Sequence, residues 1–267
     1  LFELAKPWVD RDAKAPGPLS PVAKTTLEKA LTSDPSPYVR AALLDKFLDS
    51  KWARLPGDLA PALLAGAKNP VGLGGQDPIG RTMVQARSLA LLGKMGAGLE
   101  RDYVAQILGD DKANLDLTAA AASGMARFSD EASLAALRQA LDVQAKRGYP
   151  FRKAVLLAFA SVEHASAVLD LLAIVKSSDA NNEIVGGILH RMADNEALKA
   201  SAAGAHFIRD FVLQKNTFND EMKSIALGVL DEVKAPVART ALEEIAKKSS
   251  SERLRQLAQK TLDKNFK

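Results

Sequence analysis

The sequence predicts an all-α fold, and three observations lead to that prediction. Apolar residues recur with helical periodicity almost from end to end of the 267-residue chain, and no stretch shows the sustained alternation of a half-buried strand. Aromatic residues make up only 5% of the chain while alanine, leucine, lysine and glutamate abound, which favours helices packed through small and aliphatic side chains. The third observation is a helical segment that repeats along the chain.

The repeated segment is clearest in "DPSPYVRAALLDKFL", residues 34–48. We expect Asp34 to cap this helix, two prolines to lie in its first turn, and apolar positions to continue to Phe47. Seven segments share the register, beginning at Val39, Val84, Leu117, Phe151, Ile184, Met222 and Leu254. The residues eight positions later are also apolar: Phe47, Leu92, Met125, Phe159, Met192, Leu230 and Leu262. Slightly more than two helical turns separate the first and last residue of each segment, so we expect both residues on one buried face.

The spacing of these segments leaves room for a partner helix before each one. The seven starts are 45, 33, 34, 33, 38 and 32 residues apart, which is long enough for two helices per repeat. The expected partner helices are residues 19–31, 57–67, 99–108, 130–144, 164–176, 195–214 and 237–248. Capping and turn residues stand at the joints: Gly148, Pro150, Asn181, Asn182, Asn219, Asp220 and the serines at 249–251.

The first repeat resembles a known superfamily. Asp34-Pro35 followed by Val39-Arg40-Ala41-Ala42-Leu43 is similar to the HEAT and armadillo repeats, and the resemblance covers about residues 18–264. It implies a right-handed α-α superhelix (solenoid) of about seven antiparallel helix pairs, with the second helices on the concave side. Residues 1–17 are then a linker or extended N-terminal segment, and 18–267 form the HEAT-like domain. Tetratricopeptide repeats have a similar period, but their Trp, Leu-Gly and Tyr positions are not matched.

The second position of the register is basic in four of the seven segments, and Thr118 and Val185 depart from that pattern. In the resembled superfamily, Asp and Arg of successive repeats often pair along the stack. The resemblance therefore implies bonding between repeats, rather than ligand binding, for Asp34, Arg40, Arg152 and Lys223.

One stretch suggests an enzyme. "GGQDPIGRT", residues 74–82, is one lysine short of a nucleotide-binding P-loop. A P-loop follows a strand and uses the lysine to reach the terminal phosphates, whereas a helical segment precedes this stretch and Arg81 holds the lysine position. Asp77-Pro78 is moreover a strong helix start, which would place a carboxylate where the phosphate would sit. The sequence therefore argues against nucleotide binding.

The same stretch belongs to an insertion. The interval from Val39 to Val84 exceeds the others by roughly ten residues, and these fall in "KNPVGLGGQDPIG", residues 68–80. Insertions in solenoids emerge as loops on one face, and loops of this length often carry function. If the chain has a local binding feature, Gln76 and Arg81 are the first candidates.

No catalytic, metal or cofactor site is expected. The chain contains no cysteine, no His-Glu-x-x-His and no Gly-x-Ser-x-Gly. His190 with Asp194, and His206 with Asp210, are spaced four apart and are interpreted as capped or solvated pairs. Other motifs have structural interpretations: "GKMGAG" at 93–98 as a helix C-cap and joint, Ala119 to Ala122 as a close helix contact, and Glu243-Glu244 as a solvated face.

The charge distribution bears on the partner class. The net charge is +4, of which residues 251–267 carry +3, so the body is balanced and offers no basic face for nucleic acid outside the tail. No apolar run approaches the roughly 20 residues that cross a bilayer.

Three functions are weighed. The leading hypothesis is a non-catalytic module that binds protein or peptide on a curved surface. Residues 151–214 loosely resemble the helical C-terminal domain of M1-family zinc aminopeptidases, which implies a catalytic domain upstream of Leu1 and makes 1–17 the incoming linker. The third hypothesis is a HEAT-like nucleic-acid-binding protein, against which the balanced body argues.

Overall fold

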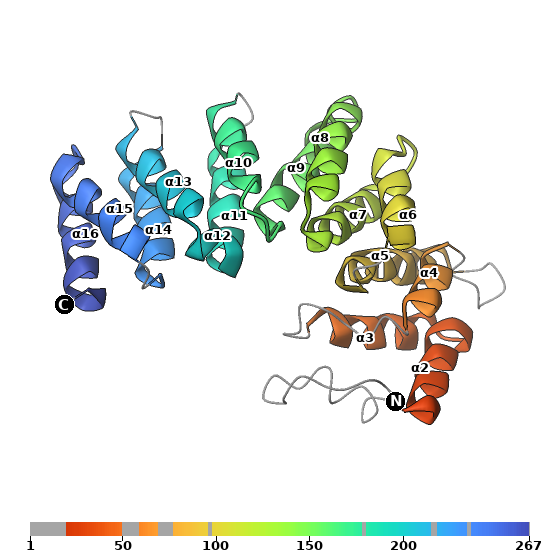
Figure 1. The fold of residues 1–267 in the computed structure, drawn as a ribbon. Coiled ribbons are helices and arrows are strands. Elements are labelled where there is room, and N and C mark those ends of the chain that lie inside the picture. Colours follow the sequence, from red (N-terminus) through yellow and green to blue (C-terminus); the bar gives the residue numbers. More distant parts are fainter. Residues whose placement is uncertain are drawn as a thin grey trace. The chain divides into compact units, whose positions relative to one another are not determined.

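The described part of the chain is entirely helical. The computed structural model describes residues 20–49, 59–68, 77–95, 98–177, 180–214, 218–233 and 236–266, so the expected N-terminal segment 1–17 lies outside it. The described ranges contain fifteen α-helices and a short 3-10 helix, and no strand (Figure 1). The all-α fold class is therefore confirmed. None of the described helices combines the length and apolarity that a membrane crossing requires.

The described helices follow one another along the chain. Their bounds are α2 Pro21–Ser33, α3 Pro37–Leu48, α4 Ala60–Lys68, α5 Pro78–Met95, α6 Gly98–Gly109, α7 Leu115–Phe128, α8 Glu131–Ala145, α9 Tyr149–Ala158, η2 Phe159–Ser161, α10 Ala167–Lys176, α11 Asn182–Ala193, α12 Glu196–Ala200, α13 Ala202–Leu213, α14 Asp220–Asp231, α15 Pro236–Lys248 and α16 Glu252–Asn265. Each helical segment expected from the sequence coincides with one or two of these helices.

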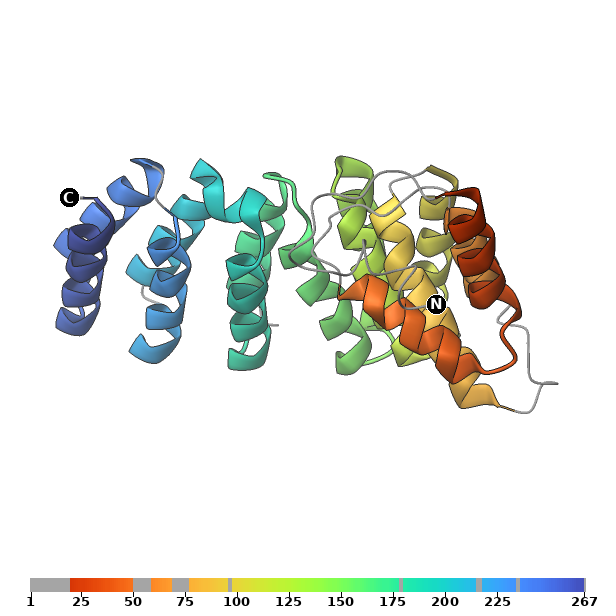
Figure 2. The same cartoon turned by 90° about the horizontal axis from the view of Figure 1, so that it is seen from below.

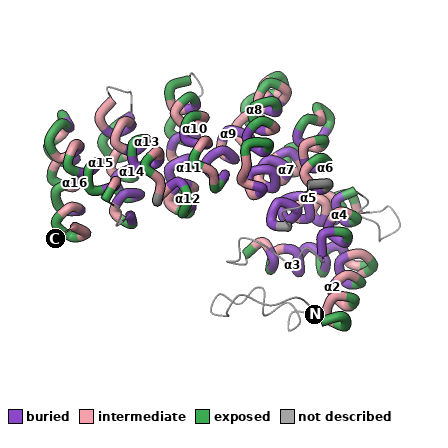
Figure 3. The backbone as a smooth tube through the Cα atoms, in the orientation of Figure 1, coloured by how far each residue is buried: buried purple, intermediate pink, exposed green. Residues whose placement is uncertain are grey.

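The chain divides into two compact units. Unit 1 comprises residues 1–128 and 135–155, and unit 2 comprises residues 129–134 and 156–267. In unit 1, α5 packs between α3 and α7, while α4 packs on α2 and α5 and α6 packs on α7. The helices α3, α5 and α7 thus form a row. Within it, α5 and α7 contain long buried stretches, drawn in purple in Figure 3. A single repeat domain over residues 18–267 stays a prediction.

Unit 2 contains two rows of helices. One row runs from α11 through α14 to α16, and the other runs from α10 through α13 to α15. The two rows also contact each other, because α13 packs on α14 and α15 packs on α16. These helices can be followed from cyan to dark blue in Figure 2.

The helix starts are capped by side chains as the sequence predicts, except at α3, where Pro35 also lies before the helix instead of in its first turn. Asn181, Asn219 and Ser251 accept hydrogen bonds from backbone N–H groups in the first turns of α11, α14 and α16. Asp34, however, does not cap α3. The cap is Ser36, which directly precedes Pro37 at the first helical position, while Asp34 closes α2 and accepts a hydrogen bond from the Ser36 N–H at 2.9 Å.

The buried register follows the expected one in most segments. Six of the seven final apolar positions are buried, and so are Val84, Ile184 and Leu254 at the first position. Val39 departs from the expectation, because it is 42% exposed. The second position is buried at Arg40, Thr118 and Val185. Because eight residues turn about 80° past two full turns and seven fall about 20° short, the buried stripe can take in either starting position.

Two of the four basic residues at the second position bond within a helix pair. The Lys223 ammonium donates to the Gln214 carbonyl at 3.0 Å, at the end of α13, and the Arg255 guanidinium donates to the Ser249 carbonyl at 2.8 Å, after α15. Cations bound to the last carbonyls of a helix complement its dipole. The bonding between repeats expected for Lys223 is therefore replaced by a bond to the neighbouring helix end.

Candidate functional site: an open groove between α5 and α7

An open groove lies in unit 1 between the first half of α5 and the start of α7. Its volume is about 600 Å³, which is in the range of ligand pockets. One wall comes from α5 and consists of Pro78, Ile79, Thr82, Met83, Ala86 and Arg87, and the other consists of Asn114, Asp116 and Ala119. The groove is therefore lined mainly by apolar groups, with a few polar groups among them. Ile79, which belongs to the α5 wall, is 69% exposed.

A glycine contact beyond the groove determines how the two helices meet. A Cβ added at Gly124 of α7 would lie 2.3 Å from the Leu89 carbonyl of α5, and one at Gly93 would lie 2.0 Å from the Gly124 carbonyl. The backbones therefore touch in the second halves of the helices, and the groove occupies the space between their first halves. Gly93, expected to mark a helix end, lies inside α5. Of the alanine run, Ala121 and Ala122 are fully buried on α7, whereas Ala119 lines the groove, so a close helix approach at the alanines stays a prediction.

The α5 wall begins at a capped helix start. The Gly80 N–H donates to the Asp77 carboxylate at 2.8 Å, with Pro78 at the first helical position, so the predicted helix start is confirmed. The Gly80 N–H and the Tyr38 hydroxyl both donate to this carboxylate and lower the pKa of Asp77. The α5 N-terminus is thus already occupied by a carboxylate, as the argument against a P-loop requires.

Contacts with α3 hold the α5 wall in place. The Arg87 guanidinium pairs with the Asp45 carboxylate, with Nε and Oδ1 2.6 Å apart. At the other end of the wall, Gly80 lies so close to Pro37 that an added Cβ would come within 2.5 Å of the proline ring. The α5 side chains that line the groove therefore start from a backbone fixed at two points.

The α7 wall is held by a cap and by an arginine from beyond α8. The Leu117 N–H donates to the Asn114 side chain at 2.9 Å, which caps α7. The Arg147 guanidinium donates to the Ala113 carbonyl and to the Gln144 side chain, and it stacks on the Phe151 ring with its carbon 3.9 Å from the ring centre. The loop that presents Asn114 and Asp116 is therefore fixed from behind.

Exposed apolar side chains occur at the starts of several unit 1 helices. Large apolar residues are exposed at the first turns of α3, α5, α7 and α9, and we call this set the apolar rim: Tyr38, Val39, Ile79, Leu115 and Tyr149. The corresponding first turns of α11, α14 and α16 in unit 2 carry exposed carboxylates instead: Glu183, Asp220, Glu221 and Glu252. In unit 2, Leu169 is exposed in the first turn of α10, so exposed apolar helix starts are more frequent in unit 1 but not confined to it.

The two binding candidates named from the sequence have different outcomes. Gln76 lies outside the described residues. Arg81 is exposed on α5 but is not among the groove-lining residues, which occupy the other side of that helix. A binding role for Arg81 stays a prediction.

The histidine pairs do not assemble a metal site in the described ranges. His190 and His206 are both exposed; Asp194 ends α11, and Asp210 pairs with Arg209 at 2.8 Å. No group of three or more His, Cys, Asp or Glu side chains in the described part of the chain is arranged to hold a metal ion.

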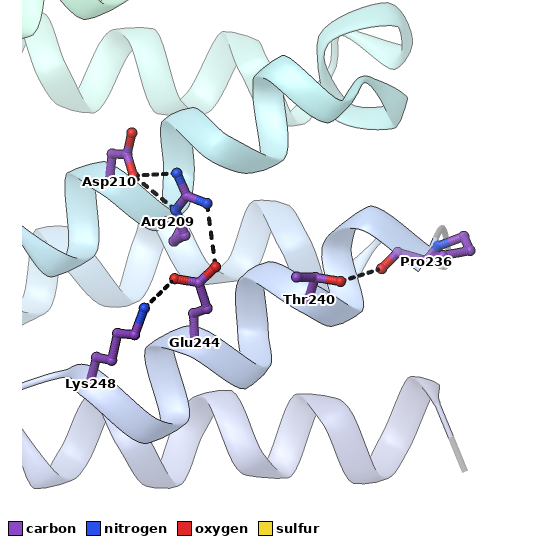
Figure 4. A network of polar contacts seen from close by, with 6 residues as sticks. All are labelled: Arg209, Asp210, Pro236, Thr240, Glu244 and Lys248. Carbon is purple, nitrogen blue, oxygen red and sulfur yellow. Dashed lines mark hydrogen bonds and ion pairs between the residues drawn. The ribbon is translucent and has the colours of Figure 1, made fainter.

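Glu244 departs from the expected solvated face. Figure 4 shows its carboxylate between two cations: Arg209 of α13 at 3.4 Å and Lys248 of α15 at 2.8 Å. Lys248 is the largest cause of the lowered pKa of Glu244. The neighbouring Glu243 is exposed and pairs with Arg239 one turn earlier. The ion pairs of Glu244 link two helices of unit 2.

Comparison with known proteins leaves the groove as the main guide to function. No protein-family model matches the chain, and no curated protein matches it. The sequence did not single out Met83, Arg87 or Asp116 as groove residues. A usable signal was the large apolar residue after a helix-starting proline, which occurs in Pro37-Tyr38 and in Pro78-Ile79.

Proposed function

We propose that this chain is a non-catalytic helical-repeat module that binds a protein or peptide, and that the groove between α5 and α7 is its principal contact. The observation that carries the proposal is the apolar groove flanked by the exposed Ile79. Binding energy in protein interfaces concentrates in a few apolar side chains that enter preformed pockets. The apolar rim on either side would extend the contact along the starts of α3, α7 and α9.

The superhelical arrangement is part of the proposal. The sequence places seven pairs of helical segments at a regular spacing, and in the described residues α3, α5 and α7 pack in one row, as do α11, α14 and α16. Rows of this kind support a right-handed solenoid of about seven antiparallel helix pairs, of the HEAT or armadillo type. Such folds present long surfaces to protein partners.

The aminopeptidase interpretation is kept as an alternative proposal. Its resemblance falls on residues 151–214, which the structure folds into α9 to α13. The coding sequence upstream of Leu1 tests it: a His-Glu-x-x-His motif there would support it, and a reading frame without one would remove it. The balanced charge of the chain argues against nucleic-acid binding. The carboxylates of Asp45, Asp77 and Asp116 near the groove also argue against it, because they would repel phosphate groups.

The binding proposal is tested with a displayed library of random dodecapeptides selected on the immobilised full chain. We expect enrichment on the wild type and about a tenfold loss of recovery on Ile79→Glu, because a charge would replace an apolar contact. The matched control is Leu169→Glu on α10. Leu169 has almost the same exposure as Ile79, 71% against 69%, but belongs to unit 2.

Circular dichroism at 222 nm establishes that both variants keep the helical content of the wild type. The proposal is wrong if no peptide is enriched on the wild type, or if Ile79→Glu recovers the enriched peptides as well as Leu169→Glu does.

A further inference from the structure

We propose that the groove selects a polypeptide segment in which a lysine or arginine lies next to an apolar side chain, and that Asp116 recognises the basic group. This inference rests on the proposed function and names the class of partner. Three observations support it: which charged side chains line the groove, which contacts these side chains already make, and how Asp116 lies relative to the apolar lining residues.

Two charged side chains line the groove, and only one of them has a partner. Arg87 is paired with Asp45 at 2.6 Å, so its charge is compensated within the fold. Asp116 is exposed in the first turn of α7 and makes no hydrogen bond or ion pair with the described part of the chain through its carboxylate. A ligand entering the groove therefore meets one uncompensated charge, and it is negative.

The wider surroundings of the groove have the same sign. Asp77 precedes the first lining residue, and Asp45 holds Arg87. Among the residues that line the groove, Arg87 is compensated by Asp45, which leaves the Asp116 carboxylate as the uncompensated charge. Local charge of one sign in a concave surface attracts partners of the opposite sign and sets their orientation.

The nearby cations are placed outside this surface. Arg81 lies on α5 away from the lining residues, and Lys112 is exposed in the loop before α7. Neither belongs to the groove lining. A basic side chain of a ligand would therefore approach Asp116 without displacing a cation of the chain from its carboxylate.

The apolar half of the specificity comes from the next turn. Ala119 lies three residues after Asp116 on α7, and Met83 and Ala86 line the opposite wall. Residues three apart on a helix lie on the same side. An apolar side chain seated between Met83 and Ala119 would thus place a neighbouring lysine or arginine beside the Asp116 carboxylate.

A purely structural role for Asp116 makes a different prediction. A carboxylate in the first turn of a helix interacts favourably with the helix dipole. If that were its only role, replacing Asp116 would change the stability of α7 and leave the preference for peptides unchanged. The readout that separates the two roles is therefore the composition of the bound peptides.

The experiment uses the same random dodecapeptide library on the full chain, selected in parallel on wild type, Asp116→Asn, Asp116→Lys and Asp111→Asn. Asp111 is the matched control, since it is an exposed carboxylate in the loop before α7 that does not line the groove. We expect lysine and arginine beside an apolar residue to be enriched on wild type and Asp111→Asn. We expect this enrichment to disappear on Asp116→Asn and to change to aspartate and glutamate on Asp116→Lys.

Affinity gives a second readout. The most enriched wild-type peptide, labelled with fluorescein, should bind Asp116→Asn about two- to fivefold more weakly than wild type in low salt, and the difference should shrink as salt is added.

The inference is overturned if Asp116→Asn retains the basic preference, or if Asp111→Asn loses it equally. Both results leave the proposed function standing as long as recovery still depends on Ile79. A library that shows no recovery dependent on Ile79 contradicts the proposed function itself, and the inference with it.

Discussion

The Tyr38 hydroxyl donates a hydrogen bond to the Asp77 carboxylate and thereby joins the start of α3 to the cap of α5. This bond raises the pKa of Tyr38 above its usual value of 10.0, and together with the Gly80 N–H it lowers the pKa of Asp77 below 3.8. The bond therefore requires a protonated tyrosine and an ionised aspartate.

The first prediction concerns the pH range of this bond. The lowered pKa of Asp77 means that its contribution is present above about pH 4 and is lost as the pH falls, and the raised pKa of Tyr38 means that its contribution is lost above about pH 10. Urea unfolding of wild type and Tyr38→Phe should therefore differ by a constant amount between about pH 5 and about pH 9. A difference that persists undiminished at pH 3 would contradict this account.

The second prediction concerns Lys94, whose contribution to the free energy of unfolding should increase as the pH rises. Lys94 is buried, and its ammonium donates to the Phe47 and Leu48 carbonyls at the end of α3 at 3.2 Å. Burial, followed by the nearby Arg127, lowers the pKa of Lys94 to about 8. The unfolded chain then binds more protons than the folded chain between about pH 8 and about pH 10.5, so stability should rise with pH in that window.

Comparison with Lys94→Met isolates this effect. The free energy of unfolding of wild type should increase relative to Lys94→Met by about 2 kcal/mol across the window, after allowance for screening by solvent. Lys46→Met, at an exposed position of α3, serves as the control and should show no such change relative to wild type. If the free energies of unfolding of wild type and Lys94→Met changed with pH in parallel, the pKa of Lys94 would not be lowered.

The third prediction applies one substitution at two helical glycines. Gly124→Ala forces a Cβ against the Leu89 carbonyl and should destabilise the chain by about 2 kcal/mol. Gly228, in the middle of α14, has no atom within 4 Å of an added Cβ, so Gly228→Ala should stabilise by about 0.5–1 kcal/mol. Urea denaturation midpoints measure both effects. Equal effects at the two sites would contradict the backbone contact between α5 and α7.

The fourth prediction concerns a buried amide in unit 2. The Asn195 side chain donates to the Ala160 and Val162 carbonyls, both at 3.0 Å, and accepts from the Leu198 N–H at 3.0 Å. Asn195→Ala leaves these buried groups without their partner and should cost about 3 kcal/mol in the free energy of unfolding. The exposed Asn182 is the control, and Asn182→Ala should change stability by less than about 0.5 kcal/mol.

The sequence predicted the helices and several of their ends, because these depend on local chemistry. Asp77-Pro78 starts α5 as expected, and Asn181, Asn219 and Ser251 cap α11, α14 and α16. The burial of the first register position was predicted wrongly at Val39, whereas it is confirmed at Val84, Ile184 and Leu254.

The groove could not be predicted from the sequence, for a different reason. Its walls combine residues 78–87 with residues 114–119, and their proximity depends on where α5 and α7 touch. Asp116 looks in sequence like any acidic residue in a first helical turn. Its distinction, that it lines a groove without a partner, appears only when the surrounding contacts are known.

The glycine contact between α5 and α7 has a consequence for the kinetics of recognition. Gly93 and Gly124 have no side chain whose rotamer could adjust the spacing of the two helices, so the width of the groove is a property of the backbone. A ligand would find its seat already formed and would lose little affinity to reorganisation of the host. Variants that loosen this contact should therefore change how long a peptide stays bound more than how often it arrives.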